Sequence, residues 1–477
     1  MKKQIKILVC VLALILLSVS ALAGCGEKPW YDPDLPIGNL VVPEYKDDVQ
    51  MFIGGFWGPS YTLGWGNQAA FDDSAEQGIT VLIPIPPNNV EFGANPTAAR
   101  EYMNMAKAAK LKVLVTDTSL GVPWNGNPGQ DVFSSQWDTT QAEWYTQHEA
   151  FAGVNFMDEP RYIHFKPLAE KYGKWREEFP GKPIFTNLLG MSVSGADAGG
   201  SAQIYLDTFM EMKPDMLSFT DYPLKDDGTV NLGTVKETAM ARAAAKQAGI
   251  SAHKYILSAG HGGPPGSGVH NKHNLTVEEM RWQVSLIQAY GYSAFSHYAV
   301  DLGSVAKAFP PPYPYTDDPW FTNGQRNDLW YNVQAVNLEA LAWDHVYLRF
   351  APGWKGTAPI TGSHGKTNLM LAIVDDGRLK VDEISGVKSV TSTQDILFGV
   401  FEDDNKNKGF MVTNVTNPMD MISGSVTVRF ETGKNGYNGV QIWEKGVPRA
   451  ELLDKDGCIS IDLEPGEGKF LIPLVKR

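Results

Sequence analysis

Short apolar runs alternate with longer amphipathic stretches between about residues 50 and 350. Eight runs have the length and composition of buried strands: 51–56, 80–85, 112–116, 153–157, 183–187, 216–220, 255–258 and 293–298. Apolar residues recur at helical spacing in 97–109, 276–290 and 329–348, and the second of these opens with a capping box, Thr-Val-Glu-Glu. These strand–helix units predict an α/β fold, a (β/α)8 TIM barrel over residues 48–352. An open, doubly wound sheet is the alternative topology, although no Gly-x-Gly-x-x-Gly follows the first strand.

The pattern changes after about residue 350, where the helical spacing stops. Short alternating runs replace it at 368–374, 396–401, 409–414, 425–430, 439–443 and 468–474. Turn residues separate these runs, for example Asp-Asp-Gly at 375–377 and Lys-Asn-Gly at 434–436. This pattern predicts a second domain, an all-β sandwich over residues 366–477.

The first residues have the pattern of a targeting signal. Lys2, Lys3 and Lys6 precede an apolar run over 7–17, which is short for a transmembrane helix. The signal ends in Leu-Ala-Gly-Cys at 22–25, which resembles the lipobox of bacterial lipoproteins. The resemblance implies a cleaved lipoprotein signal peptide (1–24), a lipid on Cys25, and a tether (25–47). The protein would then be lipid-anchored to the cell membrane and face the extracellular side. The alternative is an ordinary signal peptide with a chance cysteine.

The amino-acid composition indicates which kinds of ligand the protein can bind. A formal charge of −13 is a poor electrostatic match for nucleic acid or for an anionic membrane surface. Aromatic residues make up 11% of the chain, and aromatic rings can stack on the rings of sugars. Of the three cysteines, Cys10 leaves with the signal and Cys25 takes the lipid. Only Cys458 remains, so no intramolecular disulfide is expected in the mature protein.

Polar and aromatic residues stand at the carboxyl ends of nearly all the predicted barrel strands, where barrel enzymes place their working residues. They are Trp57 after the first strand, Asp117 after the third, Asp158 and Glu159 after the fourth, Asn187 at the fifth, Asp221 and Tyr222 after the sixth, His261 after the seventh, and His297, Tyr298 and Asp301 at the eighth. Because the stability of a barrel requires none of them, their concentration predicts a site for a polar ligand.

The fourth strand carries the most informative motif. Its end, Asn-Phe-Met-Asp-Glu-Pro at 155–160, resembles the strand-four end of clan A glycoside hydrolases, where Asn-Glu-Pro holds the general acid/base; here Asp replaces Asn. The segments 182–189, 217–223 and 276–291 also resemble a group of glycoside-hydrolase-like barrel proteins with Asp-Glu-Pro at this place. The resemblance covers about residues 50–350. It implies hydrolysis of a carbohydrate with Glu159 as the general acid/base.

The chemistry of glycoside cleavage explains this role. The leaving oxygen needs a carboxylic acid that is still protonated near neutral pH. A Glu that is partly desolvated at a strand end, beside Asp158, has its pKa raised by burial and by the like charge. The alternative is a structural role, in which Asp158 and Glu159 cap the helix around Pro160 and pair with Arg161.

A second carboxylate is harder to place. Clan A enzymes have a Glu nucleophile at the end of strand seven, where this chain has Ser-Ala-Gly-His at 258–261. Asp221 is the first substitute, followed by Asp301, Asp117 and Asp158. Tyr222 resembles the strand-six tyrosine that contacts the nucleophile in clan A, which favours Asp221. The residues predicted to bind substrate are Trp57, Asp117, Asp158, Asn187, Tyr222, His261, His297, Tyr298 and Asp301.

Together these features predict a surface-anchored glycoside hydrolase that acts on an oligo- or polysaccharide. No cofactor and no metal is expected, because His270 and His273 lack the spacing and the third ligand of a zinc site. Two alternatives remain. The missing strand-seven Glu favours a non-catalytic carbohydrate-binding lipoprotein on the same fold. A solute-binding lipoprotein of a transporter would instead have two α/β lobes. The sugar, the linkage and the stereochemical outcome stay open.

Overall fold

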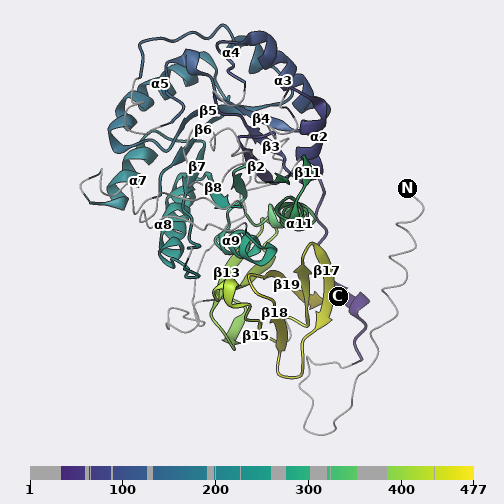
Figure 1. Cartoon of the computed structure of the whole chain (residues 1–477). Helices are drawn as coiled ribbons and strands as arrows, with labels where there is room; N and C mark the ends of the chain where they lie inside the picture. The colour runs from purple at the N-terminus through teal and green to yellow at the C-terminus, as the bar shows by residue number, and fades with distance from the viewer. Residues whose placement is uncertain are drawn as a thin grey trace.

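The computed structural model describes residues 34–59, 64, 66–86, 90–125, 133–190, 198, 200–225, 227–258, 275–300, 320–322, 324–351, 384–433 and 436–477. A barrel of parallel strands is ringed by helices, and antiparallel sheets pack against one side of it (Figure 1). The predicted fold class, a (β/α)8 barrel followed by an all-β domain, is therefore confirmed.

Eight parallel strands close the barrel in chain order. They are β2 (Phe52–Phe56), β3 (Val81–Ile83), β4 (Lys112–Val115), β5 (Phe151–Asp158), β6 (Ile184–Leu188), β7 (Met216–Thr220), β8 (Ser251–Leu257) and β9 (Ala294–Tyr298). The last strand returns to the first, since Phe52 pairs with Ala294 and Gly55 with His297. The alternative of an open, doubly wound sheet is therefore wrong. Closure brings the carboxyl ends of all the strands to one rim.

Helices surround the barrel (Figure 1). Those in the described residues are α2 (Gln68–Glu76), α3 (Pro96–Ala108), α4 (Ala142–Tyr145), α5 (Phe165–Glu178), α7 (Ala202–Glu211), α8 (Gly233–Ala248), α9 (Val277–Ala289), α11 (Asp328–Leu341) and α12 (Asp344–Tyr347). The predicted capping box forms at the start of α9, between Thr276 and Glu279. The predicted helix 329–348 is instead two helices, since Trp343 leaves helical geometry and packs its ring on Phe470. None of the described helices has the length and apolarity needed to cross a bilayer.

Two antiparallel sheets form the C-terminal sandwich. The larger has the order β13 (Ile396–Glu402), β14 (Lys408–Asn414), β19 (Gly468–Lys476), β16 (Gly439–Glu444), β17 (Val447–Leu452), and the smaller has the order β12 (Val387–Ser392), β15 (Gly424–Phe430), β18 (Cys458–Leu463). The hydrophobic pattern predicts β13 to β16 and β19 but not β12, β17 or β18. In β17 the reason is that an exposed edge strand has few apolar positions. The predicted run 368–374 lies outside the described residues.

The segment predicted as a tether contacts the sandwich. Within it, β1 (Leu40–Val41) pairs antiparallel with β19, with Leu40 opposite Lys476. Leu35 and Leu40 are buried. The chain therefore packs against the C-terminal domain before it enters the first barrel strand.

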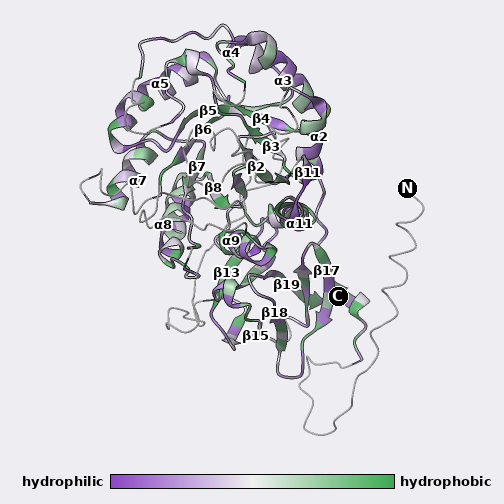
Figure 2. Ribbon diagram, viewed as in Figure 1, coloured by the Kyte–Doolittle hydropathy of each residue, from purple (hydrophilic) through white to green (hydrophobic). Residues whose placement is uncertain are grey.

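The larger sheet of the sandwich packs on α9 and α12, so that its strands have two apolar faces. Along β19, Phe470 and Ile472 join the core shared with the barrel, whereas Leu471 joins the core between the two sheets. The Phe470 ring lies 5.4 Å from that of Trp343 and 5.0 Å from that of Phe350. Apolar residues accordingly continue from the barrel into the sandwich, while polar residues lie on outward helix faces (Figure 2).

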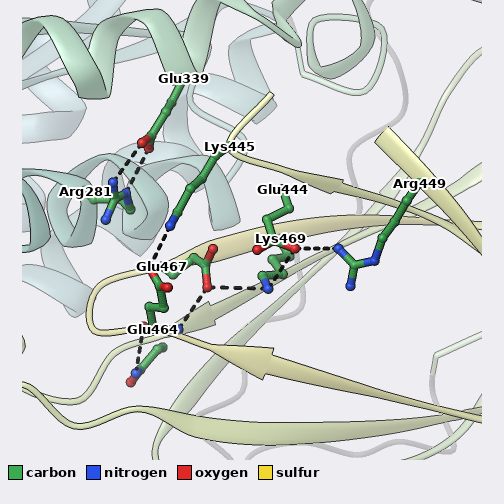
Figure 3. A network of polar contacts seen from close by, with 9 residues as sticks. Arg281, Glu339, Glu444, Lys445, Arg449, Glu464, Glu467 and Lys469 are labelled. Carbon is green, nitrogen blue, oxygen red and sulfur yellow. Dashed lines mark hydrogen bonds and ion pairs between the residues drawn. The ribbon is translucent and has the colours of Figure 1, made fainter. Parts of the chain in front are cut away.

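A network of charged residues borders this interface (Figure 3). On the barrel side, Arg281 of α9 makes a bidentate ion pair with Glu339 of α11, at 2.7 and 2.8 Å. On the sandwich side, Lys469 lies 3.0 Å from Glu444. The network also includes Lys445, Arg449, Glu464 and Glu467. Opposite charges are therefore matched where the two domains meet.

Candidate functional site

The carboxyl end of β5 places two acidic residues in succession at the rim of the barrel. The Asp158 N–H donates to the carbonyl oxygen of Trp124 at 2.8 Å, and the Glu159 N–H donates to that of Asn187 at 2.7 Å. Glu159 has a φ of +50°, in the left-handed region that non-glycine residues rarely adopt. Such strain persists only where the surrounding structure imposes it, and it concentrates at functional sites.

Burial governs the ionisation of this acidic pair. Asp158 is 8% exposed, and its Oδ1 accepts a 2.9 Å hydrogen bond from Asn187 Nδ2. Burial raises the pKa of both carboxyls. The negative charge of Asp158 raises the pKa of Glu159 further, whereas the hydrogen bond from Asn187 opposes the rise for Asp158. Burial and the like charge of Asp158 therefore both favour the protonated form of Glu159.

Aromatic side chains from four barrel strands, β2, β7, β8 and β9, form a cluster beside the acidic pair. Burial is the largest cause that raises the pKa of Tyr222, which follows β7, and of Tyr255 on β8. The charges of the two carboxylates raise both pKa values further, although Tyr298 has a larger effect than they do on Tyr222. The Tyr298 ring lies 5.5 Å from that of Tyr222 and 5.8 Å from that of Trp57. Within the described residues, the Tyr255 hydroxyl and the Trp57 indole N–H make no hydrogen bond. Tyrosine and tryptophan side chains of this kind can stack their rings on a ligand and hydrogen-bond to it through the hydroxyl or the indole N–H.

Asp221, the predicted second carboxylate, contacts the helix-facing side of the barrel wall. Its Oδ2 lies 3.5 Å from Lys254 Nζ, and both side chains are largely buried. Lys254 also donates to Thr234 on α8 at 2.5 Å and lies over the Phe219 ring. The ion pair therefore holds the Asp221 carboxylate toward α8.

Asp117, another predicted site residue, makes local contacts after β4. Its Oδ1 accepts from the Ser119 N–H at 3.0 Å, and its Oδ2 accepts from the Tyr145 hydroxyl at 3.1 Å. Burial is the largest cause that raises its pKa, to about 6. The carboxylate is thus engaged by a turn and by a buried tyrosine.

His297 lies on β9 but faces outward. Its Nε2 is 2.7 Å from Asn337 Oδ1 on α11, and the side chain is fully buried. Burial lowers its pKa to about 4. The structure therefore places His297 between the barrel wall and a helix, while Tyr298 faces the ring cluster.

We expect the burial of neutral His297 to make the protein less stable in mild acid. An unfolded chain has an ordinary histidine pKa of about 6.5. Between pH 6.5 and 4 the unfolded state therefore binds more protons, and stability falls as the pH falls. This one group contributes a loss of about 2 kcal/mol between pH 7 and pH 5. Urea unfolding of the wild type and of His297→Gln at both pH values measures it, because Gln does not titrate. An equal pH dependence of the two proteins would contradict the expectation.

A row of buried hydrogen bonds crosses the barrel interior next to the acidic pair. Asn187 Nδ2 also donates to Thr220 Oγ1 at 2.6 Å, and the Ser218 hydroxyl donates to Asn187 Oδ1 at 2.8 Å. Ser218 Oγ lies 2.8 Å from His253 Nδ1, and His253 Nε2 lies 2.7 Å from Ser296 Oγ. Of these residues the sequence predicts only Asn187 as part of the site.

His253 was not predicted as a site residue, because the polar start of β8 does not have the apolar pattern of a buried strand. The predicted strand begins at residue 255, whereas β8 begins at Ser251. One signal was available: His253 and Tyr255 are two residues apart, so they share one face of a strand. Three other predicted residues, His261, Asp301 and Cys25, lie outside the described residues.

One group in the described residues has the composition of a metal site. Asp47, Asp344 and His345 bring ligand atoms within 4.8 Å of one another. However, Asp344 Oδ2 accepts from the Met51 N–H at 2.9 Å, beside the amino end of β2. The group therefore lies at the end of the barrel opposite Glu159, and we assign no metal to it.

Comparison with known proteins supports the fold. No family model matches the chain, and no curated protein matches it. A solved structure described as a glycoside hydrolase has a TM-score of 0.50 at 10% identity, and the match covers 93% of this chain and 98% of that one. A maltogenic α-amylase from Thermotoga neapolitana has a TM-score of 0.45 at 10% identity (90% and 99% covered). A family 30 xylanase from Clostridium acetobutylicum has a TM-score of 0.43 at 8% identity (90% and 99% covered). The chain thus has the (β/α)8 barrel fold found among glycoside hydrolases.

Proposed function

We propose that the protein is a glycoside hydrolase that acts on an oligo- or polysaccharide, with Glu159 as the general acid/base. One observation carries the proposal: burial and the Asp158 charge favour the protonated form of Glu159, at the rim where barrel enzymes hold their working residues. A carboxyl in that state gives its proton to the leaving oxygen of a glycoside near neutral pH. The rings of Trp57, Tyr222 and Tyr298 would stack on the sugar.

Asp221 is the proposed partner carboxylate, and Asp158 is the next candidate. Lys254 balances the negative charge that a base or nucleophile must carry. To act on a sugar, Asp221 would have to turn from Lys254 toward Glu159. Asp158 needs no such movement. However, it is adjacent in sequence to Glu159, the proposed acid, whereas the two carboxyls of a glycosidase stand on either side of the scissile bond.

A panel of polysaccharides and aryl glycosides tests the proposed function. We expect the purified protein to release new reducing ends from at least one of them. Affinity electrophoresis on the same glycans measures binding separately from cleavage. A protein that binds glycans and cleaves none would be a non-catalytic carbohydrate-binding protein.

One observation favours that second function. β8 is the seventh barrel strand, and its residues Ser251–Leu257 include no carboxylate. A retaining mechanism would then need its nucleophile from another strand. By contrast, the closed barrel differs from the two α/β lobes on which the transporter alternative depended.

We also propose that the protein is a lipoprotein on the outer face of the cell membrane, with its lipid on Cys25. The lipobox-like sequence supports this. We expect Cys25→Ser to move the protein from the membrane fraction to the soluble fraction. Cys458→Ser is the matched control, because Cys458 lies on β18. A Cys25→Ser protein that stays in the membrane through alkaline extraction would contradict the proposal.

A further inference from the structure

One row of polar side chains links five consecutive barrel strands, β5 to β9. Its members are Asp158, Asn187, Ser218, His253 and Ser296, each at most 8% exposed. The row ends against β2, where glycine is required: a Cβ at Gly54 would lie 1.9 Å from the Ser296 hydroxyl oxygen. Barrel interiors are ordinarily filled by branched apolar side chains. A continuous polar row is therefore not needed for closure.

With the Asn187 amide oriented as in the structure, donor counting gives one direction for every hydrogen bond in the row. The two amide hydrogens of Asn187 go to Asp158 and Thr220, so Asn187 Oδ1 accepts the one hydroxyl hydrogen of Ser218. The contact between Ser218 and His253 then requires His253 Nδ1 to be the donor. A neutral imidazole has one N–H, so Nε2 accepts from the Ser296 hydroxyl. All four bonds therefore point toward the Asp158 carboxylate.

With a neutral His253, the opposite direction is the other complete arrangement. If Asp158 were protonated and donated to Asn187, the amide would have to turn over and donate to Ser218. Ser218 would then donate to His253 Nδ1, and the proton of His253 would lie on Nε2. The tautomer of His253 is thus tied to the position of a proton on Asp158, three strands away.

We propose that Asn187, Ser218, His253 and Ser296 are positioning residues that hold Asp158 as the ionised member of the acidic pair, so that the pair's proton resides on Glu159. The inference rests on the proposed function of Glu159 as a general acid. Hydrogen bonds aligned in one direction polarise one another and strengthen the last bond, here the one to the carboxylate.

The surroundings of the row support this assignment. The rings of Phe52, Phe185 and Tyr255 surround His253 at 5.2 to 5.3 Å between ring centroids. This apolar setting disfavours the imidazolium, and burial lowers the pKa of His253 to about 3. The two serine hydroxyls on either side therefore contact a neutral ring.

Asp158 has its own set of ionisable neighbours. Glu159 follows it directly after the end of β5, and Tyr222 after β7 and Tyr255 on β8 lie close enough to feel its charge. Both tyrosines stay neutral because burial raises their pKa. Among the described residues that act on the acidic pair, the row is therefore the main support for a negative charge on Asp158.

Nitrogen NMR of ¹⁵N-histidine-labelled protein at pH 7 tests the inference. We expect a neutral His253 with its proton on Nδ1, assigned by contacts with the Phe52 and Phe185 ring protons. A proton on Nε2, or an imidazolium, would overturn the proposal. The measurement uses the wild type, so it does not depend on a variant that folds poorly.

Two variants separate positioning from simple packing. Ser218→Ala breaks the row between Asn187 and His253, and Thr220→Val removes the other Asn187 contact with little change of shape. We expect Ser218→Ala to abolish the single Nδ1–H tautomer and Thr220→Val to preserve it. In ¹³C-carboxyl titrations, Ser218→Ala should raise the midpoint of Asp158 by about half a pH unit. An unchanged tautomer and midpoint in folded Ser218→Ala would contradict the role.

The outcomes distinguish this inference from the proposed function. Suppose that the wild type cleaves no glycan, but that it shows the Nδ1–H tautomer and that Ser218→Ala shifts the Asp158 midpoint. The proposed role of the polar row then stands, and the proposed hydrolase activity is wrong. If Glu159→Gln abolishes hydrolysis while His253 carries its proton on Nε2, the activity stands and the row fails.

Discussion

Glu159→Gln is expected to lower kcat on an unactivated glycan by about 10²–10⁴-fold, or roughly 3–5 kcal/mol of barrier. Gln keeps the shape and the hydrogen bonding of the side chain but cannot donate the proton that the leaving oxygen needs. Binding of the sugar should change little. On an aryl glycoside with a good leaving group the loss should be smaller, because less protonation is needed. Initial rates on the two substrates measure the difference.

Glu149→Gln is the matched control for this loss, because Glu149 pairs with Lys107 on the surface, where its side chain is 74% exposed. We expect it to keep wild-type rates. The pH dependence gives an independent check: Glu159 acts while protonated, so its raised pKa should extend activity above the ordinary Glu value of about 4.3. A Gln variant that is undiminished on both substrates would remove Glu159 from the mechanism.

Phe470→Ala is expected to lower the free energy of unfolding by about 3–5 kcal/mol. Phe470 is fully buried, and its ring packs on Trp343 and Phe350 from the barrel as well as on Phe401 from its own sheet. Truncation leaves a cavity at the junction of the two domains, which the surrounding rings cannot fill without moving. Urea unfolding followed by tryptophan fluorescence and by far-ultraviolet circular dichroism measures the loss.

Two further variants on β19 serve as comparisons for Phe470→Ala. Leu471→Ala removes a side chain from the opposite face of the same strand, inside the sandwich, and should cost about 2–5 kcal/mol. Val475 is 40% exposed, so Val475→Ala should stay within about 0.5 kcal/mol of the wild type. If Phe470→Ala behaved like Val475→Ala, the sandwich would not depend on this junction for its stability.

Much of the fold could be predicted because the barrel strands are buried on both faces. Runs such as Val81–Ile83 are then continuously apolar, and the order of the runs alone predicts parallel pairing and closure. Prediction from the sequence failed where a strand lacks that burial or where a helix is interrupted. β17 has an exposed edge, and the helix predicted over 329–348 stops where Trp343 turns toward the sandwich.

Part of the candidate site could be predicted for a similar reason. Strand order places the ends of β5, β6 and β7 side by side, so Asp158, Glu159 and Asn187 could be grouped from their positions. Strand order does not say which way a rim side chain turns. His297 faces α11, and Asp221 pairs with Lys254, because buried partners on neighbouring helices and strands hold them there.

The fold class and the acidic pair can be predicted from the sequence, because both depend on local patterns: the spacing of apolar runs and the Asp-Glu-Pro that follows one of them. The ionisation of that pair depends instead on contacts that form only when the barrel closes. The pKa of Glu159 depends on burial, and the charge of Asp158 depends on a hydrogen bond from Asn187 and, through it, on His253, a residue 95 positions along the chain. No local pattern records which polar side chains meet inside a closed barrel, because closure brings together strands that are distant in sequence.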